Sequence, residues 1–90
     1  MYKPKNVQER IVHRLKISVG QLKRVVKMVE ENDYCIDILH QSQAVQKALR
    51  QTDNLILENH LHTCAAKAIR QGKGKEDIAE VMALVKKSQA

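Results

Sequence analysis

The sequence has few of the residues that small monomeric proteins use to fill a core. Its 90 residues include no Trp, no Phe and only two Tyr, together with one Pro and three Gly. Aromatic rings supply much of the buried area in compact domains, and chains of this size bury only about 60–65% of their unfolded surface. We therefore expect a core that is shared between chains. The scarcity of Pro and Gly also argues against a collagen-like chain and against a turn-rich β-sandwich.

Longer sequence features are missing as well. No uninterrupted apolar run approaches the roughly 20 residues that a membrane-spanning helix needs, and no charged and apolar leader precedes a small-residue cleavage site. With 43% hydrophobic residues, the chain is too apolar for a disordered tail. We expect a single all-helical domain over residues 1–90 that works in the cytoplasm without a membrane partner.

Apolar residues recur at helical spacing along nearly the whole chain. Asn6 followed by Glu9 is a variant of the capping box that begins helices. Asp33 is a suitable N-cap for a second helix, and Gly72 is a natural stop for it. The apolar stripes and these caps predict three helices, over about residues 7–31, 34–71 and 75–87. The expected fold class is therefore all-α, with three helices per chain.

The expected second helix is too long to be covered within one small monomer. It would measure about 57 Å at a rise of about 1.5 Å per residue, whereas average helices have about 11–12 residues. One strip along it has heptad-like spacing diluted with polar residues, and consists of Ile38, Ser42, Val45, Leu49, Thr52, Ile56, Asn59 and Thr63. We expect an antiparallel second copy of the chain to cover this strip. Close approach of a neighbouring backbone would also justify Gly20 within the first helix.

Positive charge is concentrated in the first third of the chain. The formal net charge is +6, and residues 1–32 hold eight Lys or Arg against three Glu. Such a local excess is typical of a surface that meets a polyanion such as DNA. A solvated face without a partner explains it equally well.

The two cysteines and one histidine have spacings that suggest a metal site. Cys64 follows His60 by four residues, which places both side chains on one face of a helix. Cys35 lies 25 residues before His60, about 20° short of seven full turns and therefore on the same face, but about 37 Å away. One intact helix cannot bring the three together. Two antiparallel copies that cross near Ala48 can, and their symmetry gives two equivalent sites per dimer.

Two thiolates and one imidazole are soft donors that suit Cu(I) or Zn(II) rather than Mg or Ca. Three ligands match Cu(I) at low coordination number, whereas a structural zinc site takes a fourth protein ligand. The alternative interpretation is two inert thiols beside a hydrogen-bonded histidine, because free cysteine is often simply a small buried side chain.

Several segments together resemble the CsoR/RcnR family of metal-sensing transcriptional repressors, most of all its copper-sensing CsoR type. The resemblance covers nearly the whole chain. The segments that carry it are His13–Lys16, Gly20, Tyr34–Cys35, Gln41–Gln46, His60–Cys64 and the acidic third helix.

The resemblance implies that Cys35 of one chain and His60 and Cys64 of another hold Cu(I) in a trigonal site, with Tyr34 and Glu80 around it. It implies a disc-like dimer of dimers without a helix-turn-helix. It further implies that the metal-free tetramer binds operator DNA and that Cu(I) releases it, which switches on copper-efflux genes. A hydrogen-bond path from the outer nitrogen of His60 through Glu80 and Tyr34 is expected to couple the two events.

The resemblance also points to residues of the DNA surface. Arg14 matches a basic position that the family uses at DNA. Arg50 lies near a second such position, but the residue aligned there is Gln51, a departure from the family pattern. Further phosphate contacts are expected from basic residues of the first helix, namely Lys16, Lys23, Lys27 and Arg24.

Other functions remain as alternatives. A family member could respond to nickel or cobalt, to persulfide or to formaldehyde. Residues 1–6 lack the histidines of the nickel and cobalt sensors, however, and this chain has His60, whereas persulfide sensors lack the matching histidine. A helical interaction module that does not bind DNA is a second alternative. We expect no enzyme, because the sequence shows no carboxylate pair, Gly-rich phosphate loop or Ser/Cys-His-Asp order.

Overall fold

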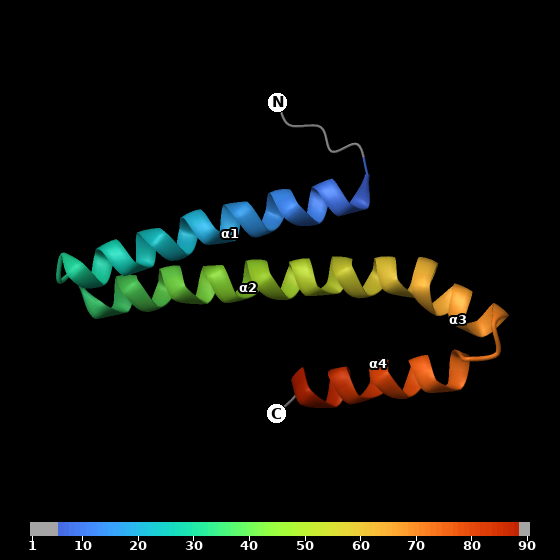
Figure 1. The fold of residues 1–90 in the computed structure, drawn as a ribbon. Coiled ribbons are helices and arrows are strands. Elements are labelled where there is room, and N and C mark those ends of the chain that lie inside the picture. The colour runs from blue at the N-terminus through green and yellow to red at the C-terminus, as the bar shows by residue number, and fades with distance from the viewer. Residues whose placement is uncertain (1–5, 89–90) are drawn as a thin grey trace. The chain divides into compact units, whose positions relative to one another are not determined.

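The structure, a computed structural model that describes residues 6–88, consists of helices joined by short turns (Figure 1). The elements are α1 (Val7–Glu30), α2 (Cys35–His60), the π-helix η1 (Leu61–Ala65), α3 (Ala66–Arg70) and α4 (Gly74–Ser88). No strand occurs among the described residues. The predicted all-α class is confirmed. The first and third predicted helices correspond to α1 and α4, and the second corresponds to the run of α2, η1 and α3.

Local hydrogen bonds and backbone angles explain where α1 begins, and how the chain turns from α1 into α2. The Asn6 side chain accepts a hydrogen bond of 2.8 Å from the Glu9 backbone N–H, as expected of an N-cap. After Glu30 the chain turns through Asn32, whose φ of 56° lies in the left-handed region that Asn tolerates. The carbonyl of Tyr34 accepts from Ile38 at 3.1 Å. Tyr34 is therefore the N-cap of α2, one residue after the expected position.

The contacts divide the chain into two compact units, the first of which runs to Ile56. Within it, α1 and α2 lie antiparallel and side by side (Figure 1). Ser18 from α1 and Val45 and Thr52 from α2 are buried, and the Thr52 hydroxyl donates to the Ala48 carbonyl at 3.0 Å. The Ser18 hydroxyl is buried and has no hydrogen-bond partner in the described part of the chain.

Most large apolar side chains of this first unit remain exposed. Leu22, Val26 and Leu39, for example, are each 53% exposed. Of the apolar side chains in residues 6–87, only Val45 and Ala65 are buried. Among the described residues, no atom outside the adjacent backbone of α1 lies within 4 Å of the position that a Cβ on Gly20 would take. Residues 6–88 of the same chain therefore do not make the close approach expected there.

The second unit begins at Leu57 and contains the end of α2, then η1, α3 and α4. Helical structure continues through η1 and stops at Gly72, whose φ is +78°. There the Lys73 N–H donates to the Ala68 carbonyl at 2.7 Å and the Gly72 N–H to Ile69 at 3.1 Å, which is the Schellman arrangement. The predicted stop at Gly72 agrees with this geometry, whereas the π-helix was not expected.

The boundary between the two units falls inside α2, and residues 1–90 as a single domain stay a prediction. Among the described helices, none combines the length and the apolar character needed to cross a membrane.

Candidate metal centre

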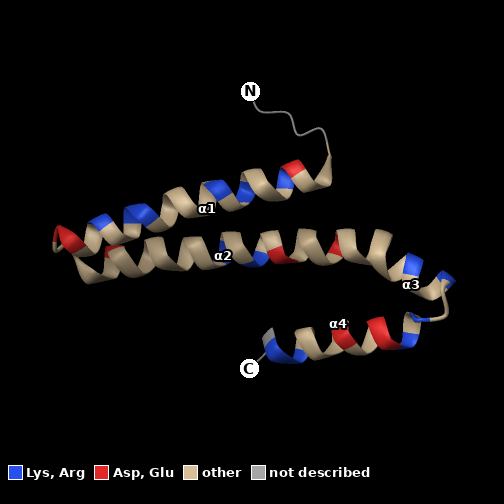
Figure 2. Ribbon diagram, in the orientation of Figure 1, with Lys and Arg blue, Asp and Glu red and all other residues tan. Residues whose placement is uncertain are grey.

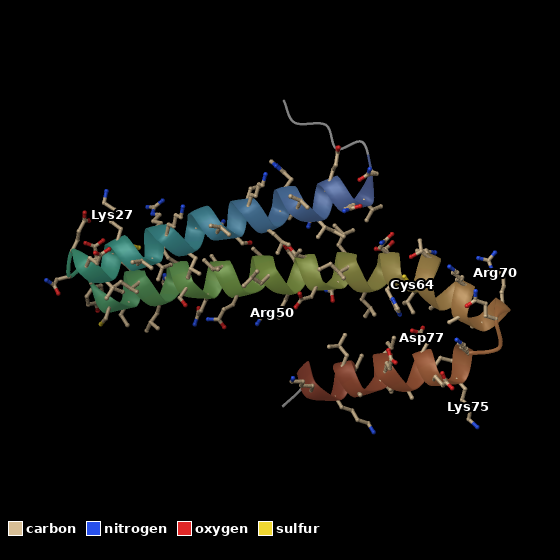
Figure 3. The ribbon with its side chains drawn as sticks, viewed as in Figure 1. Lys27, Arg50, Cys64, Arg70, Lys75 and Asp77 are labelled. Carbon is tan, nitrogen blue, oxygen red and sulfur yellow. The ribbon has the colours of Figure 1, made fainter. Side chains whose placement is uncertain are left out.

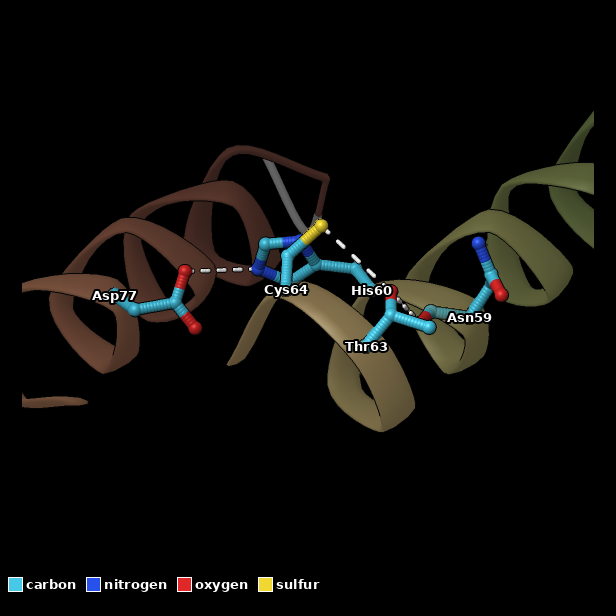
Figure 4. A network of polar contacts seen from close by, with 5 residues as sticks. All are labelled: Asn59, His60, Thr63, Cys64 and Asp77. Atoms are coloured by element: carbon cyan, nitrogen blue, oxygen red, sulfur yellow. Dashed lines mark hydrogen bonds and ion pairs between the residues drawn. The ribbon is translucent and has the colours of Figure 1, made fainter. Parts of the chain in front are cut away.

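His60, Cys64 and Asp77 form a small polar cluster in the second unit (Figure 4). His60 ends α2, Cys64 lies in η1, and Asp77 stands in the first turn of α4. His60 Nε2 lies 2.8 Å from Asp77 Oδ1. The imidazole is one-third exposed and the carboxylate only 13% exposed. Two helical segments joined by the turn at Gly72 thus meet at one histidine ring.

The contact with Asp77 decides which nitrogen of the ring can bind a metal. A carboxylate only accepts hydrogen bonds, so Nε2 carries the proton that it receives. In the neutral ring the lone pair is then on Nδ1. The hydrogen bond that Asp77 accepts from the ring raises the pKa of His60, and a second hydrogen bond with Cys64 raises it further. Asp77 therefore orients the His60 ring, and the thiol of Cys64 forms a hydrogen bond with the same ring.

Cys64 has two neighbours that stabilise its thiolate. The Thr63 hydroxyl, 3.6 Å from Cys64 Sγ, lowers the pKa of this cysteine most, and the hydrogen bond with His60 lowers it further. The same hydroxyl donates to the Asn59 carbonyl at 2.8 Å. Because a hydroxyl has one proton, Thr63 serves one of these acceptors at a time. A lower pKa gives more thiolate at neutral pH, and thiolate is the form that binds metals.

The π-helix lies at this cluster. Its i→i+5 hydrogen bonds widen one turn, and such turns inside α-helices occur frequently at functional sites. The π-helix covers Leu61–Ala65, so it begins directly after His60 and contains Cys64. The spacing of His60 and Cys64 predicts a regular α-helix through this region. The pairing of His60 with Cys64 persists even though the backbone differs from that prediction.

The structure does not gather all the predicted ligands within one chain. Cys35 is exposed and is the first residue of α2, in the first unit. In residues 6–88 no three His, Cys, Asp or Glu side chains come together as a metal site would require. Of the two residues expected around the metal, Tyr34 is 66% exposed and Glu80 is exposed on α4. The roles of Tyr34, Cys35 and Glu80 stay predictions.

The basic residues expected at DNA lie mainly along α1, where Lys and Arg recur over its length (Figure 2). Arg14 is half-buried and lines a hollow of about 100 Å³ with Ser18 of the same helix and Gln51 of α2. The Lys27 ammonium lies 3.8 Å from the carboxylate of Glu31, and both side chains are largely exposed. The remaining predicted contacts are all exposed side chains, namely Lys16, Lys23, Arg24 and Arg50 (Figure 3 shows Lys27 and Arg50).

Sequence reasoning missed Asp77 and Thr63 as members of this cluster. Asp77 was recognised only as an acidic residue at a helix N-terminus, and it lies 17 residues after His60 across a turn. Its contact therefore has no signal in helical spacing. Thr63 did have one, because it directly precedes Cys64 and lies four residues after Asn59.

Comparison with known proteins places these features in one family. A family model described as "Metal-sensitive transcriptional repressor" matches residues 7–87. The copper-sensing transcriptional repressor CsoR of Bacillus subtilis is 40% identical over 86 residues, which are 96% of this chain and 85% of that protein. The solved CsoR of Geobacillus thermodenitrificans with Cu(I) has a TM-score of 0.89 and 46% identity, covering 100% of this chain and 94% of that chain.

A second solved structure is more distant. The nickel-responsive transcriptional regulator InrS has a TM-score of 0.73 and 30% identity, and the match covers 97% of each chain. The resemblance inferred from the sequence is confirmed by the family match, and the all-α fold by the likeness to the solved structures. The chain belongs to the family of metal-sensitive transcriptional repressors.

Proposed function

We propose that this chain is a Cu(I)-responsive transcriptional repressor. It binds operator DNA when free of metal, is released by Cu(I), and controls copper-efflux genes. The observation that carries the proposal is the pairing of His60 with Cys64, in which Asp77 occupies Nε2 and the Cys64 thiolate is stabilised. The relatives named as copper sensors support the choice of metal. The family consists of repressors, and we assign no catalytic activity to the chain.

The donor set fits Cu(I). Thiolate sulfur and imidazole nitrogen are soft ligands, and both are available in a cluster whose pKa shifts favour thiolate on Cys64. We assign Cys35 of one chain and His60 and Cys64 of its partner as the ligands. When bound, the metal supplies a bridge between two chains. Within one chain, α2 is a continuous α-helix from Cys35 to His60, so it keeps these two residues at opposite ends.

The assembly that this site requires is an antiparallel dimer, and we propose that two dimers form the tetramer. The exposed apolar side chains along α1 and α2 support such an assembly, because a second chain packed against them would bury them. Operator DNA is the second partner, and the basic face of α1 is the surface proposed to meet it. A DNA-binding regulator of this kind works in the cytoplasm.

Release from DNA requires that Cu(I) binds the DNA-competent and the DNA-incompetent conformations with different affinities. The proposed path starts at the His60 ring, which already joins α2 to α4 through its hydrogen bond. Glu80 and Tyr34 are proposed to extend this path in the assembled protein.

One titration tests the proposal. Cu(I) is added to reduced protein in the presence of a competing chelator, while binding to labelled DNA from upstream of the protein's own gene is followed by fluorescence anisotropy. We expect one Cu(I) per protomer, with loss of DNA binding as the metal loads. His60→Ala and Cys35→Ala should each abolish the response, whereas His40→Ala, an exposed histidine of α2, should retain it.

Four outcomes contradict the proposal in different ways. DNA release by Ni(II) but not by Cu(I) supports the nickel-responsive alternative, to which the likeness to InrS points. Tight Cu(I) binding without DNA release indicates storage or transport. Absence of both responses indicates a helical interaction module, and a strictly monomeric protein excludes a site shared between chains.

A further inference from the structure

Among residues 6–88, Asp77 is the one acidic residue that lies within hydrogen-bond distance of the candidate ligand His60. The distance from Asp77 Oδ1 to His60 Nε2 is 2.8 Å, and the Asp77 side chain is only 13% exposed (Figure 4). We propose that Asp77 is a positioning residue of the metal site, which holds the His60 ring in the tautomer that presents Nδ1 to the metal. This inference deepens the proposed function and rests on His60 being a ligand.

The chemistry of imidazole explains why such a contact matters. A neutral ring has one N–H and one lone pair, and the partner of the N–H selects which nitrogen is which. Metal-bound histidines almost always donate their other N–H to a carboxylate, a carbonyl or water, which fixes the ring and makes the ligating nitrogen more basic. In this chain Asp77 supplies such a partner, because its Oδ1 lies 2.8 Å from His60 Nε2. The contact orients the ring with Nδ1 available to a metal.

The placement of Asp77 on α4 distinguishes it from the neighbouring acids. Glu76 directly precedes it and is exposed, and Glu80 lies about one turn further along and is also exposed. Asp77 alone of the three is partly buried. Its short side chain has few rotamers, so little conformational entropy is lost when the contact forms. Asp77 and Glu80 are thus proposed to have separate roles, since of these two acids only Asp77 contacts the ring in the described part of the chain.

The backbone around Asp77 makes this position well defined. The Asp77 N–H donates to the Lys73 carbonyl at 3.2 Å in the first turn of α4. That turn starts at Gly74, where α4 approaches Ile69 of α3 so closely that a Cβ on the glycine would lie 2.6 Å from Ile69 Cγ1. The turn at Gly72 and this close approach bring α4 back to the end of α2. These local backbone contacts consequently place the carboxylate beside the ring.

The first experiment measures the tautomer directly, in metal-free protein labelled with ¹⁵N. The ring nitrogen shifts of His60 are recorded at a pH well above its pKa. In the wild type we expect protonated Nε2 and unprotonated Nδ1. Asp77→Ala should give a mixture of the two tautomers, whereas Glu76→Ala should leave the His60 signals unchanged. Asp77→Glu should restore part of the wild-type pattern, because it keeps the carboxylate.

The second experiment measures Cu(I) affinity by chelator competition on the same variants. Loss of a hydrogen-bond partner behind a metal ligand typically lowers affinity about 10- to 100-fold, and we expect that range for Asp77→Ala. Glu76→Ala, the matched control on the same turn, should bind as the wild type does. Far-UV circular dichroism of each variant establishes that the helices are intact.

The two readouts separate this inference from the proposed function. An unchanged His60 tautomer in Asp77→Ala overturns the inference, and so does a changed tautomer accompanied by unchanged Cu(I) affinity. A wild-type protein that binds no Cu(I) refutes the proposed function, and with it the role of Asp77 at a metal. In that case the tautomer measurement would still report whether Asp77 orients the ring.

Discussion

The close approach of Gly74 to Ile69 leads to a quantitative prediction for Gly74→Ala. An ideal Cβ at this position would lie 2.6 Å from Ile69 Cγ1 and 3.3 Å from Ile69 Cα. The flexible end of Ile69 could move, but its Cα belongs to the backbone of α3. Overpacking of this kind costs about 1–3 kcal/mol, and the better helix propensity of Ala returns at most about 1 kcal/mol. We expect a net loss of about 1–2 kcal/mol, estimated from these two terms.

The substitution should also disturb the metal cluster, because α4 carries Asp77 to His60. Urea unfolding at a fixed protomer concentration measures the loss in stability. The His60 ring nitrogen shifts show whether the 2.8 Å contact with Asp77 persists. Gly72→Ala tests the other glycine of this turn and should also destabilise, because its φ of +78° disfavours side chains with a Cβ. A Gly74→Ala protein with wild-type stability and unchanged His60 signals would refute this reasoning about the turn.

Three further predictions concern other residues of the chain. Gly20→Ala should stabilise the protein by about 1 kcal/mol and raise Tm by roughly 4–8 °C, since a Cβ there meets no described atom outside the adjacent backbone of α1 within 4 Å. A lower Tm would instead indicate that a partner chain packs against Gly20. Thr63→Val should raise the pKa of Cys64, seen as slower alkylation of this thiol at neutral pH in a Cys35→Ser background. The pKa of His60 is raised in the folded chain, so protonated His60 stabilises the fold. This stabilisation should be complete below the unfolded pKa of about 6.5 and should be lost as pH rises through the pKa of His60 in the folded chain. Urea unfolding at successive pH values measures this trend.

The local rules of helix formation predicted most of the fold. The Asn6 cap and the Gly72 stop both act through neighbouring backbone groups, so the residues themselves carry the information. The π-helix at Leu61–Ala65 left no comparable signal, because no side-chain pattern marks one widened turn within a helix. The N-cap of α2 also differed from expectation. Asp33 has a good capping side chain, but the backbone enters the helix at Tyr34.

The site divides in the same way into local and distant parts. His60 and Cys64 were predictable as a pair, because four residues of helix bring them together. Asp77 was not, because its contact depends on how the chain turns at Gly72 and how closely α4 can approach Ile69. Spacing along one helix says nothing of such a turn.

The exposed apolar side chains and the separation of Cys35 from His60 along α2 both indicate that a partner helix is needed. Burying one such side chain contributes about 1.5–3 kcal/mol, and Leu22, Val26 and Leu39 all remain more than half exposed in the single chain. A partner helix that removes them from water would supply the free energy of assembly. The same partner would have to bring its own Cys35 to His60, because α2 is continuous between them. Assembly and metal binding are then two consequences of one packing arrangement, and a substitution that weakens the apolar contact should weaken both.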